Sequence, residues 1–160
     1  MAHSRREYWK NINDKKQRDK TGIEWNETHK KHVYDRHSIL PISYLSKLIG
    51  LTKPMTLCTI NGVLVKISSS RHEVFNQRQS CVTCGVHGMY LAIERSWRSA
   101  KMPKHVEQTY HINMYGINNQ GNEVLMTKDH IIPKSKGGRN HIDNYVTMCT
   151  KCNTKKGNKL

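Results

Sequence analysis

The last 35 residues of the chain, 126–160, carry most of the side chains whose types and spacing could support chemistry. Asp129 and His130 are adjacent, and Asn153 directly follows a cysteine. A histidine has an ordinary pKa of about 6.5, which suits a general base at neutral pH. Carboxylate and amide oxygens are ligands for hard divalent cations. His130 is therefore a candidate general base, and Asp129 and Asn153 are candidate ligands for a catalytic Mg²⁺ or Mn²⁺ ion. On its own, an Asp-His pair is more often only a polar pair at the end of a strand.

Four of the five cysteines form two Cys-x-x-Cys pairs, Cys81 with Cys84 and Cys149 with Cys152. This spacing lets two thiolates from one turn occupy neighbouring corners of a tetrahedron, and two pairs complete the closed four-sulfur site of structural zinc. The site would join distant segments, because 64 residues separate Cys84 from Cys149. Redox-active pairs and disulfides are the alternatives, but a reducing compartment favours metal. We expect a structural, non-catalytic Zn²⁺ ion, and we expect Cys58 to be an ordinary buried or half-buried thiol.

The composition indicates a polyanionic partner. The formal net charge is +15, and such an excess favours nucleic acid as the partner class, because each neutralised phosphate releases counterions. A generically basic protein is the alternative. Hydrophobic residues make up 36% of the chain, which is low for a self-sufficient core, so bound metal is expected to contribute to folding. Because the sequence contains no run of 18 apolar residues and no signal-peptide pattern, we expect a cytoplasmic protein without a membrane partner.

Local patterns in the first half predict a helix followed by a hairpin. Apolar residues recur at helical spacing in 40–49, where Pro41 fits the first turn and Gly50 offers a stop. The next run, 56–67, is centred on Asn61-Gly62 and predicts a tight hairpin, because both turn residues must adopt positive φ. We prefer this interpretation to a helix-turn-helix, and a winged helix stays possible.

Local patterns in the second half predict the strands that position the chemistry. Residues 70–79 are expected to form a short helix capped by Ser69 or Ser70. A hairpin turning at 118–121 is expected to deliver Asp129 and His130 at the end of its second strand. Asn144 is expected to open another strand, and a short helix is expected to begin at Asn153.

In two segments the apolar residues recur with no clear period. Residues 1–39 are expected to form a basic, mostly helical N-terminal extension, which is either a DNA-contacting arm or a solvated extension. Residues 86–111 are interpreted as an exposed insertion loop in preference to a DNA-facing surface.

The pattern D-H-I-x-P-x-S-x-G-G-x-N, followed by N-x-x-x-x-C-x-x-C-N-x-x-K, resembles the HNH family of nucleases. The resemblance covers residues 126–159 and extends to the first cysteine pair. It implies an α+β fold with a small zinc-stabilised ββα-metal nuclease core, in which Asn144 braces the loop and orients His130. Asn153 stands where many members of the family have histidine, which places the chain with an Asn-containing branch. The implied division is an extension at 1–39 and a nuclease domain at 40–160, the latter with a lead-in (40–80), knuckles (81–84 and 149–152), an insertion (86–111) and a catalytic motif (112–160).

The resulting functional hypothesis is a metal-dependent HNH DNA endonuclease that nicks or cuts DNA, similar to small phage-encoded homing-type enzymes acting in the host cytoplasm. We expect a monomer or weak homodimer. Basic side chains near the motif are candidate phosphate contacts: Lys134, Lys136, Arg139, Lys155 and Lys156. The alternatives are a non-catalytic zinc-dependent nucleic-acid-binding module, and a nuclease acting on branched DNA or RNA.

Overall fold

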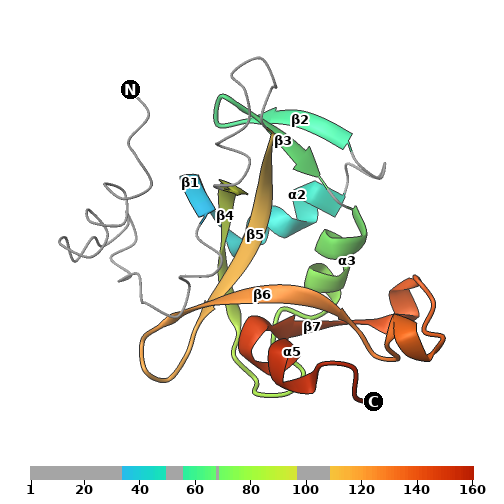
Figure 1. Ribbon diagram of the computed structural model, residues 1–160. Coiled ribbons are helices and arrows are strands. Elements are labelled where there is room, and N and C mark those ends of the chain that lie inside the picture. Colours follow the sequence, from blue (N-terminus) through green and yellow to red (C-terminus); the bar gives the residue numbers. More distant parts are fainter. Residues whose placement is uncertain (1–33, 50–55, 68, 97–108) are drawn as a thin grey trace.

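The computed structural model describes residues 34–49, 56–67, 69–96 and 109–160 (Figure 1). The expected helical extension lies outside the described residues up to position 33, and so does Gly50. The described part mixes helices and strands and contains more strand than helix, so the predicted combination of α and β structure is confirmed. No helix in this part is long and apolar enough to cross a membrane.

The described strands form one sheet. Its main path runs in the order β1-β4-β5-β3-β2, and β6 pairs with both β5 and β7. Strands β3 and β5 are parallel, and the other pairs are antiparallel. The bounds are β1 Tyr34–Pro41, β2 Thr56–Ile60, β3 Val63–Ile67, β4 Gly88–Ser96, β5 Tyr110–Ile117, β6 Glu123–His130 and β7 Tyr145–Cys149.

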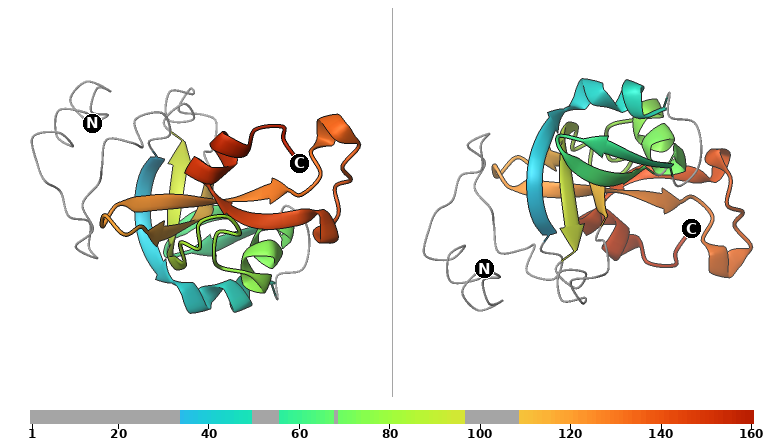
Figure 2. Two further views of the ribbon diagram at one scale, coloured as in Figure 1. Left: turned by 90° about the horizontal axis from the view of Figure 1, so that it is seen from below. Right: turned by 90° about the horizontal axis from the view of Figure 1, so that it is seen from above.

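Short helices connect and cover the strands. They are the 3-10 turns η2 Ile42–Tyr44, η3 Lys134–Lys136 and η4 Ile142–Asn144, and the α-helices α2 Leu45–Ile49, α3 Ser69–Gln77 and α5 Thr150–Lys156. The main core lies between α2, α3 and one face of the sheet, where Leu48, Phe75, Leu91 and Met114 are fully buried. The β6–β7 hairpin has α3 on one side and α5 on the other (Figure 2).

Several local predictions are confirmed. Asn61 and Gly62 adopt φ of 50° and 81° at the turn between β2 and β3, as a tight hairpin requires. Helix α3 lies where a helix was expected, and β5 and β6 form the predicted hairpin, with Met114 opposite Met126. The helix expected over 40–49 is shorter, because β1 extends to Pro41 and the α-helical part begins only at Leu45.

The interpretation of 86–111 as an exposed insertion loop is wrong for β4, and residues 97–108 lie outside the described part. Strand β4 pairs with β1 on one edge and β5 on the other, and residues 91–94 are entirely buried. A strand buried on both faces has no alternation of apolar and polar residues, so periodicity could not identify it.

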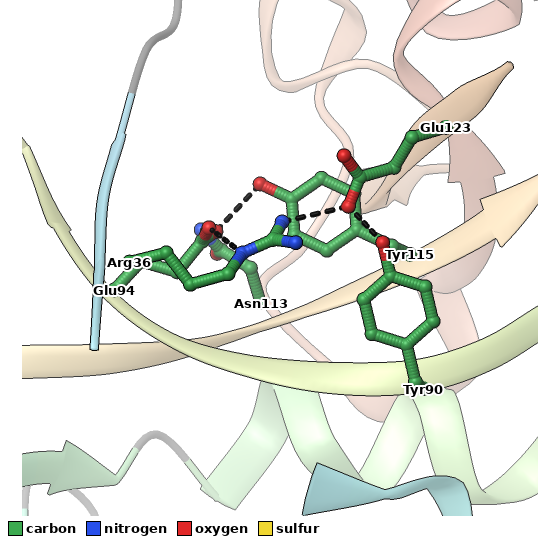
Figure 3. Close-up of polar contacts among 6 residues, drawn as sticks. All are labelled: Arg36, Tyr90, Glu94, Asn113, Tyr115 and Glu123. Atoms are coloured by element: carbon green, nitrogen blue, oxygen red, sulfur yellow. Dashed lines mark hydrogen bonds and ion pairs between the residues drawn. The ribbon is translucent and has the colours of Figure 1, made fainter. Parts of the chain in front are cut away.

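A buried polar network occupies the other face of the sheet (Figure 3). Arg36 in β1 forms ion pairs with Glu94 in β4, at 2.9 Å, and with Glu123 in β6, at 2.7 Å. Tyr115 donates a hydrogen bond to Glu94, and Tyr90 donates one to Glu123. The expected boundary between residues 39 and 40 therefore lies within β1, a strand tied to β4 by backbone hydrogen bonds and to β4 and β6 by buried ion pairs.

Candidate metal centre and active site

The two cysteine pairs come together in space. The sulfur atoms of Cys81, Cys84, Cys149 and Cys152 all lie within 4.8 Å of one another, and no disulfide joins the cysteines of the described residues. The Sγ atoms of Cys84 and Cys149 are 3.7 Å apart. Tetrahedral zinc with bonds of about 2.3 Å places neighbouring sulfurs about 3.8 Å apart. The cluster can therefore hold a metal ion such as zinc, whereas Cys58 is half-buried in β2, away from the cluster.

Local backbone structure positions each pair. The first pair lies in a tight turn in which Gly85, at φ 76°, donates its N–H to the Cys81 carbonyl. The Val82 N–H donates to the Thr147 carbonyl, which docks this turn on β7. In the second pair, Cys149 ends β7 and its Sγ accepts the Cys152 N–H at 3.4 Å, as the cap of α5. The same strand end thus positions both pairs.

The cluster distributes charge unevenly among its thiols. Burial raises the pKa of Cys81, but N–H groups at Cys149, Cys84 and Thr83 outweigh it and lower that pKa to about 6. Burial raises the pKa of Cys152, and its sulfur neighbours raise it further. Four thiolates this close repel one another, and a bound cation offsets that repulsion. The donor set, spacing and backbone N–H groups all suit a structural metal ion.

The predicted catalytic residues lie around the β6–β7 hairpin and α5. Asp129 and His130 end β6, and Asn153 lies within α5, which begins at Thr150, three residues earlier than expected. Asp129 forms an ion pair with Lys156 at 2.6 Å, and the same ammonium donates to the His130 carbonyl. Lys156 is thus a partner of Asp129 and is less exposed than the other four predicted phosphate contacts, all of which are exposed.

The amide of Asn153 has a defined orientation. Its Nδ2 donates to the Thr127 hydroxyl at 3.1 Å, while that hydroxyl donates its own proton to the Met148 carbonyl. Because Thr127 can then act only as an acceptor toward the amide, Oδ1 is the atom of Asn153 that remains to bind a cation. Asp129 and Asn153 therefore offer hard oxygens from two adjacent elements, a donor set that suits Mg²⁺ or Mn²⁺.

Side chains of β6 alternate between two faces of the hairpin. Thr127 and Asp129 contact α5, whereas Lys128 and His130 contact Tyr145 in β7. This follows from the period of two in a strand. Asp129 and His130 consequently flank the end of β6 from opposite sides.

Asn144 holds the loop between β6 and β7. Its Oδ1 accepts the Ile132 N–H at 2.9 Å, and its Nδ2 donates to the carbonyls of Ile132 and Arg139 at 3.1 and 3.0 Å. No hydrogen bond between its side chain and His130 occurs among the described residues. The backbone of Gly138 lies close to the same groups, since a Cβ at this position would overlap the Ile132 carbonyl and lie 3.0 Å from Asn144 Nδ2.

Sequence reasoning missed the residues that contact the His130 ring. Asn140 Oδ1 lies 2.9 Å from Nε2, and the Tyr145 ring lies edge-on at 4.9 Å between centroids. Asn140 stands within the G-G-x-N pattern, so its position was visible although its contact was not. Tyr145 carried no such signal, because an aromatic residue in a strand usually packs in the core.

Residues 118–160 match the family model described as HNH endonuclease. This segment belongs to the HNH family. No curated protein and no solved structure matches the chain.

The HNH segment includes β6, β7 and α5 with all of the predicted catalytic residues. It contains Cys149 and Cys152 but not Cys81 and Cys84. The metal cluster therefore joins the HNH segment to a turn that lies upstream of the match.

Proposed function

We propose that the chain is a metal-dependent HNH endonuclease that hydrolyses phosphodiester bonds in DNA. The observation that carries this proposal is the coincidence of the family match with one strand end, where Asp129 and His130 flank β6 and where α5, which carries Asn153, packs against the same strand. The charge of +15 supports a nucleic-acid substrate. The four-cysteine cluster would hold a structural zinc ion, because its donors are all sulfur and leave no open position.

The oxygens of Asp129 and Asn153 would hold a catalytic Mg²⁺ or Mn²⁺ ion. Such an ion, when bound, supplies Lewis-acid stabilisation of the negative charge that develops on the phosphate and the leaving oxygen. Lys156, which pairs with Asp129 Oδ2 at 2.6 Å, would add a positive charge at the same strand end.

His130 would act as the general base. A phosphate lying across the end of β6 would have the Asp129 carboxylate on one side and the imidazole on the other. His130 takes a proton from a water molecule, the water oxygen forms a bond to phosphorus, and the bond to the 3′-oxygen breaks. The products are a 5′-phosphate and, after protonation, a 3′-hydroxyl. The exposed cations Lys134, Lys136, Arg139 and Lys155 would bind flanking phosphates.

The test is cleavage of supercoiled plasmid by the purified full chain with Mg²⁺ or Mn²⁺. We expect nicked or linear product, and we expect His130→Ala to lower the rate by at least about 100-fold, within the range of general-base catalysis. His141→Ala is the matched control, because His141 is an exposed histidine in the same loop. Equal cleavage by wild type and His130→Ala would contradict the proposal, and DNA binding without cleavage by either would indicate a non-catalytic module.

The same assay separates the possible substrates. Duplex DNA, a four-way junction and RNA are offered in parallel, and the proposal requires the duplex to be cut. A cleavage map on genomic DNA then tests the narrower expectation of a homing-type, phage-encoded enzyme, which predicts one or a few strongly preferred sites.

A further inference from the structure

We propose that Asn140 and Tyr145 are positioning residues that hold His130 in one orientation and one tautomer, with the proton on Nε2 and the basic lone pair on Nδ1. This inference rests on the proposed function and names the atom at which the proton would be taken. Both residues lie outside β6, so the contacts that position His130 come from the loop and from the neighbouring strand β7.

Asn140 determines the tautomer. Its Oδ1 lies 2.9 Å from His130 Nε2. An amide oxygen has no proton to donate, so Nε2 must be the donor in this hydrogen bond. In a neutral imidazole the other nitrogen is then the acceptor. Nδ1 is thereby left as the atom that can remove a proton from water.

Tyr145 restricts the plane of the imidazole. The two residues are directly opposite in the β6–β7 ladder, and their rings meet edge-on at an interplanar angle of 73°. Lys128 Nζ lies 4.0 Å from the Tyr145 ring centroid and donates a hydrogen bond to Ser70 in α3. The tyrosine is therefore held between the ammonium group and the histidine, and it limits rotation of His130.

This arrangement also explains how Asn144 can affect His130 without contacting it. Asn144 holds the carbonyl of Arg139, the residue that precedes Asn140. Since Asn140 is itself exposed, its position depends on this bracing of the loop backbone. The orienting effect expected of Asn144 is thus transmitted through Asn140.

The first experiment measures the tautomer directly, in the full chain labelled with ¹⁵N and held at a pH where the ring is neutral. The ring nitrogen shifts of His130, assigned by comparison with His130→Gln, should show a protonated Nε2. Asn140→Ala should give a mixture of tautomers, whereas Asn140→Asp should keep the wild-type pattern because a carboxylate also accepts from Nε2. Asn122→Ala, the same change in the β5–β6 turn, should leave the His130 signals unchanged.

The second experiment measures the steady-state kinetics of cleavage of duplex DNA. Asn140→Ala should lower kcat by about 10- to 100-fold, by analogy with the groups that orient metal-ligating histidines, with little change in KM for DNA. Asn140→Asp should recover most of this loss. Tyr145→Leu should lower kcat, and Tyr145→Phe, which keeps the ring, should recover most of this loss.

A protonated Nδ1 in the wild-type protein, or an unchanged tautomer in Asn140→Ala, would overturn the inference. Equal kcat values for Tyr145→Leu and Tyr145→Phe would overturn the part assigned to Tyr145. The tautomer does not depend on cleavage, so a failed nuclease assay with a protonated Nε2 would contradict the proposed function and leave the positioning of His130 intact.

Discussion

At the scale of single residues, Asn144 is the side chain on which the loop between β6 and β7 depends most. It makes three hydrogen bonds to backbone groups that are five and twelve residues away. Each such bond contributes about 1 kcal/mol. Because these groups lie at the surface, the loss of the side chain should loosen the loop without unfolding the molecule.

We therefore expect Asn144→Ala to increase the amide exchange rate of Ile132, whose N–H donates to Asn144 Oδ1. Exchange at Ile112 in β5 should be unchanged. The measurement is hydrogen exchange followed by NMR. Unaltered protection at Ile132 would mean that the loop is held by something other than this side chain.

His72 predicts a pH dependence of stability. Its side chain is buried in α3, and the nearby backbone of Ile112 favours the charged form of the ring less than burial opposes it. Burial, and then the nearby charge of Arg71, lower its pKa from 6.5 to about 4. As the pH falls through 6.5, the unfolded chain binds the proton first, so folding stability decreases until the pH reaches about 4.

The effect should reach about 3 kcal/mol, since each pKa unit corresponds to about 1.4 kcal/mol. His72→Leu should remove this loss, and the difference between the two proteins isolates it from other groups that titrate equally in both. Urea unfolding at several pH values between these limits is the measurement. If the free energies of unfolding of the wild type and His72→Leu changed in parallel with pH, His72 would not titrate in this way.

At the scale of elements, the end of β7 links the two centres. Cys149 and Cys152 belong to the metal cluster, and the next residue, Asn153, is a predicted ligand in the active site. A change in the cluster should therefore alter both folding and the position of Asn153.

The cysteine pairs give a prediction with a matched control. A structural zinc ion contributes about 10 kcal/mol or more to folding, which is comparable to the whole stability of a typical domain. Cys81→Ser/Cys84→Ser should therefore lose bound zinc and cooperative unfolding. Cys58→Ser should keep both, because Cys58 is a free thiol outside the cluster. Metal analysis and thermal unfolding are the measurements, and a well-folded, metal-free double variant would refute a structural role.

The buried network joins β1, β4, β5 and β6. Glu94 is completely buried beside Arg36 and also accepts hydrogen bonds from Asn113 and Tyr115. Removing one partner from a buried ion pair costs about 3–5 kcal/mol, because a charge is left without compensation.

Glu94→Ala should be destabilised by that amount, and adding Arg36→Met should recover part of the loss. Glu73→Ala, an exposed glutamate in α3, is the control and should change stability by less than about 0.5 kcal/mol. Denaturant unfolding provides the values. If the effects of Glu94→Ala and Arg36→Met on the free energy of unfolding were fully additive, the two side chains would not be energetically coupled.

At the scale of the whole molecule, the excess of positive charge is expected to govern the proposed association with nucleic acid. The logarithm of the DNA affinity should fall linearly with the logarithm of salt concentration, with a slope of about −0.9 for each phosphate neutralised. The triple variant Lys134→Gln/Lys136→Gln/Arg139→Gln should reduce the magnitude of that slope by about 2 to 3. Lys47→Gln, an exposed change in α2, should have a smaller effect. Fluorescence anisotropy at several salt concentrations measures both, and an unchanged slope in the triple variant would place the DNA elsewhere.

Sequence-local features were predictable because their causes are local. Asn61-Gly62 specifies its turn through its own backbone preferences, and alternating residues identify the β5–β6 hairpin. The type and spacing of the cysteines likewise predicted a shared cluster, because two adjacent thiolates in one turn occupy only half of a tetrahedral site.

Features that depend on distant partners were not predictable. Strand β4 is buried on both faces and therefore has no alternating pattern, and Arg36 contacts a carboxylate 58 residues away. The sequence by itself determined which residue types could do chemistry and which short elements would carry them. Only the tertiary structure decided that Asp129 pairs with Lys156 and that Asn140 and Tyr145 contact His130, because these contacts require the loop, β7 and α5 to close around the end of β6.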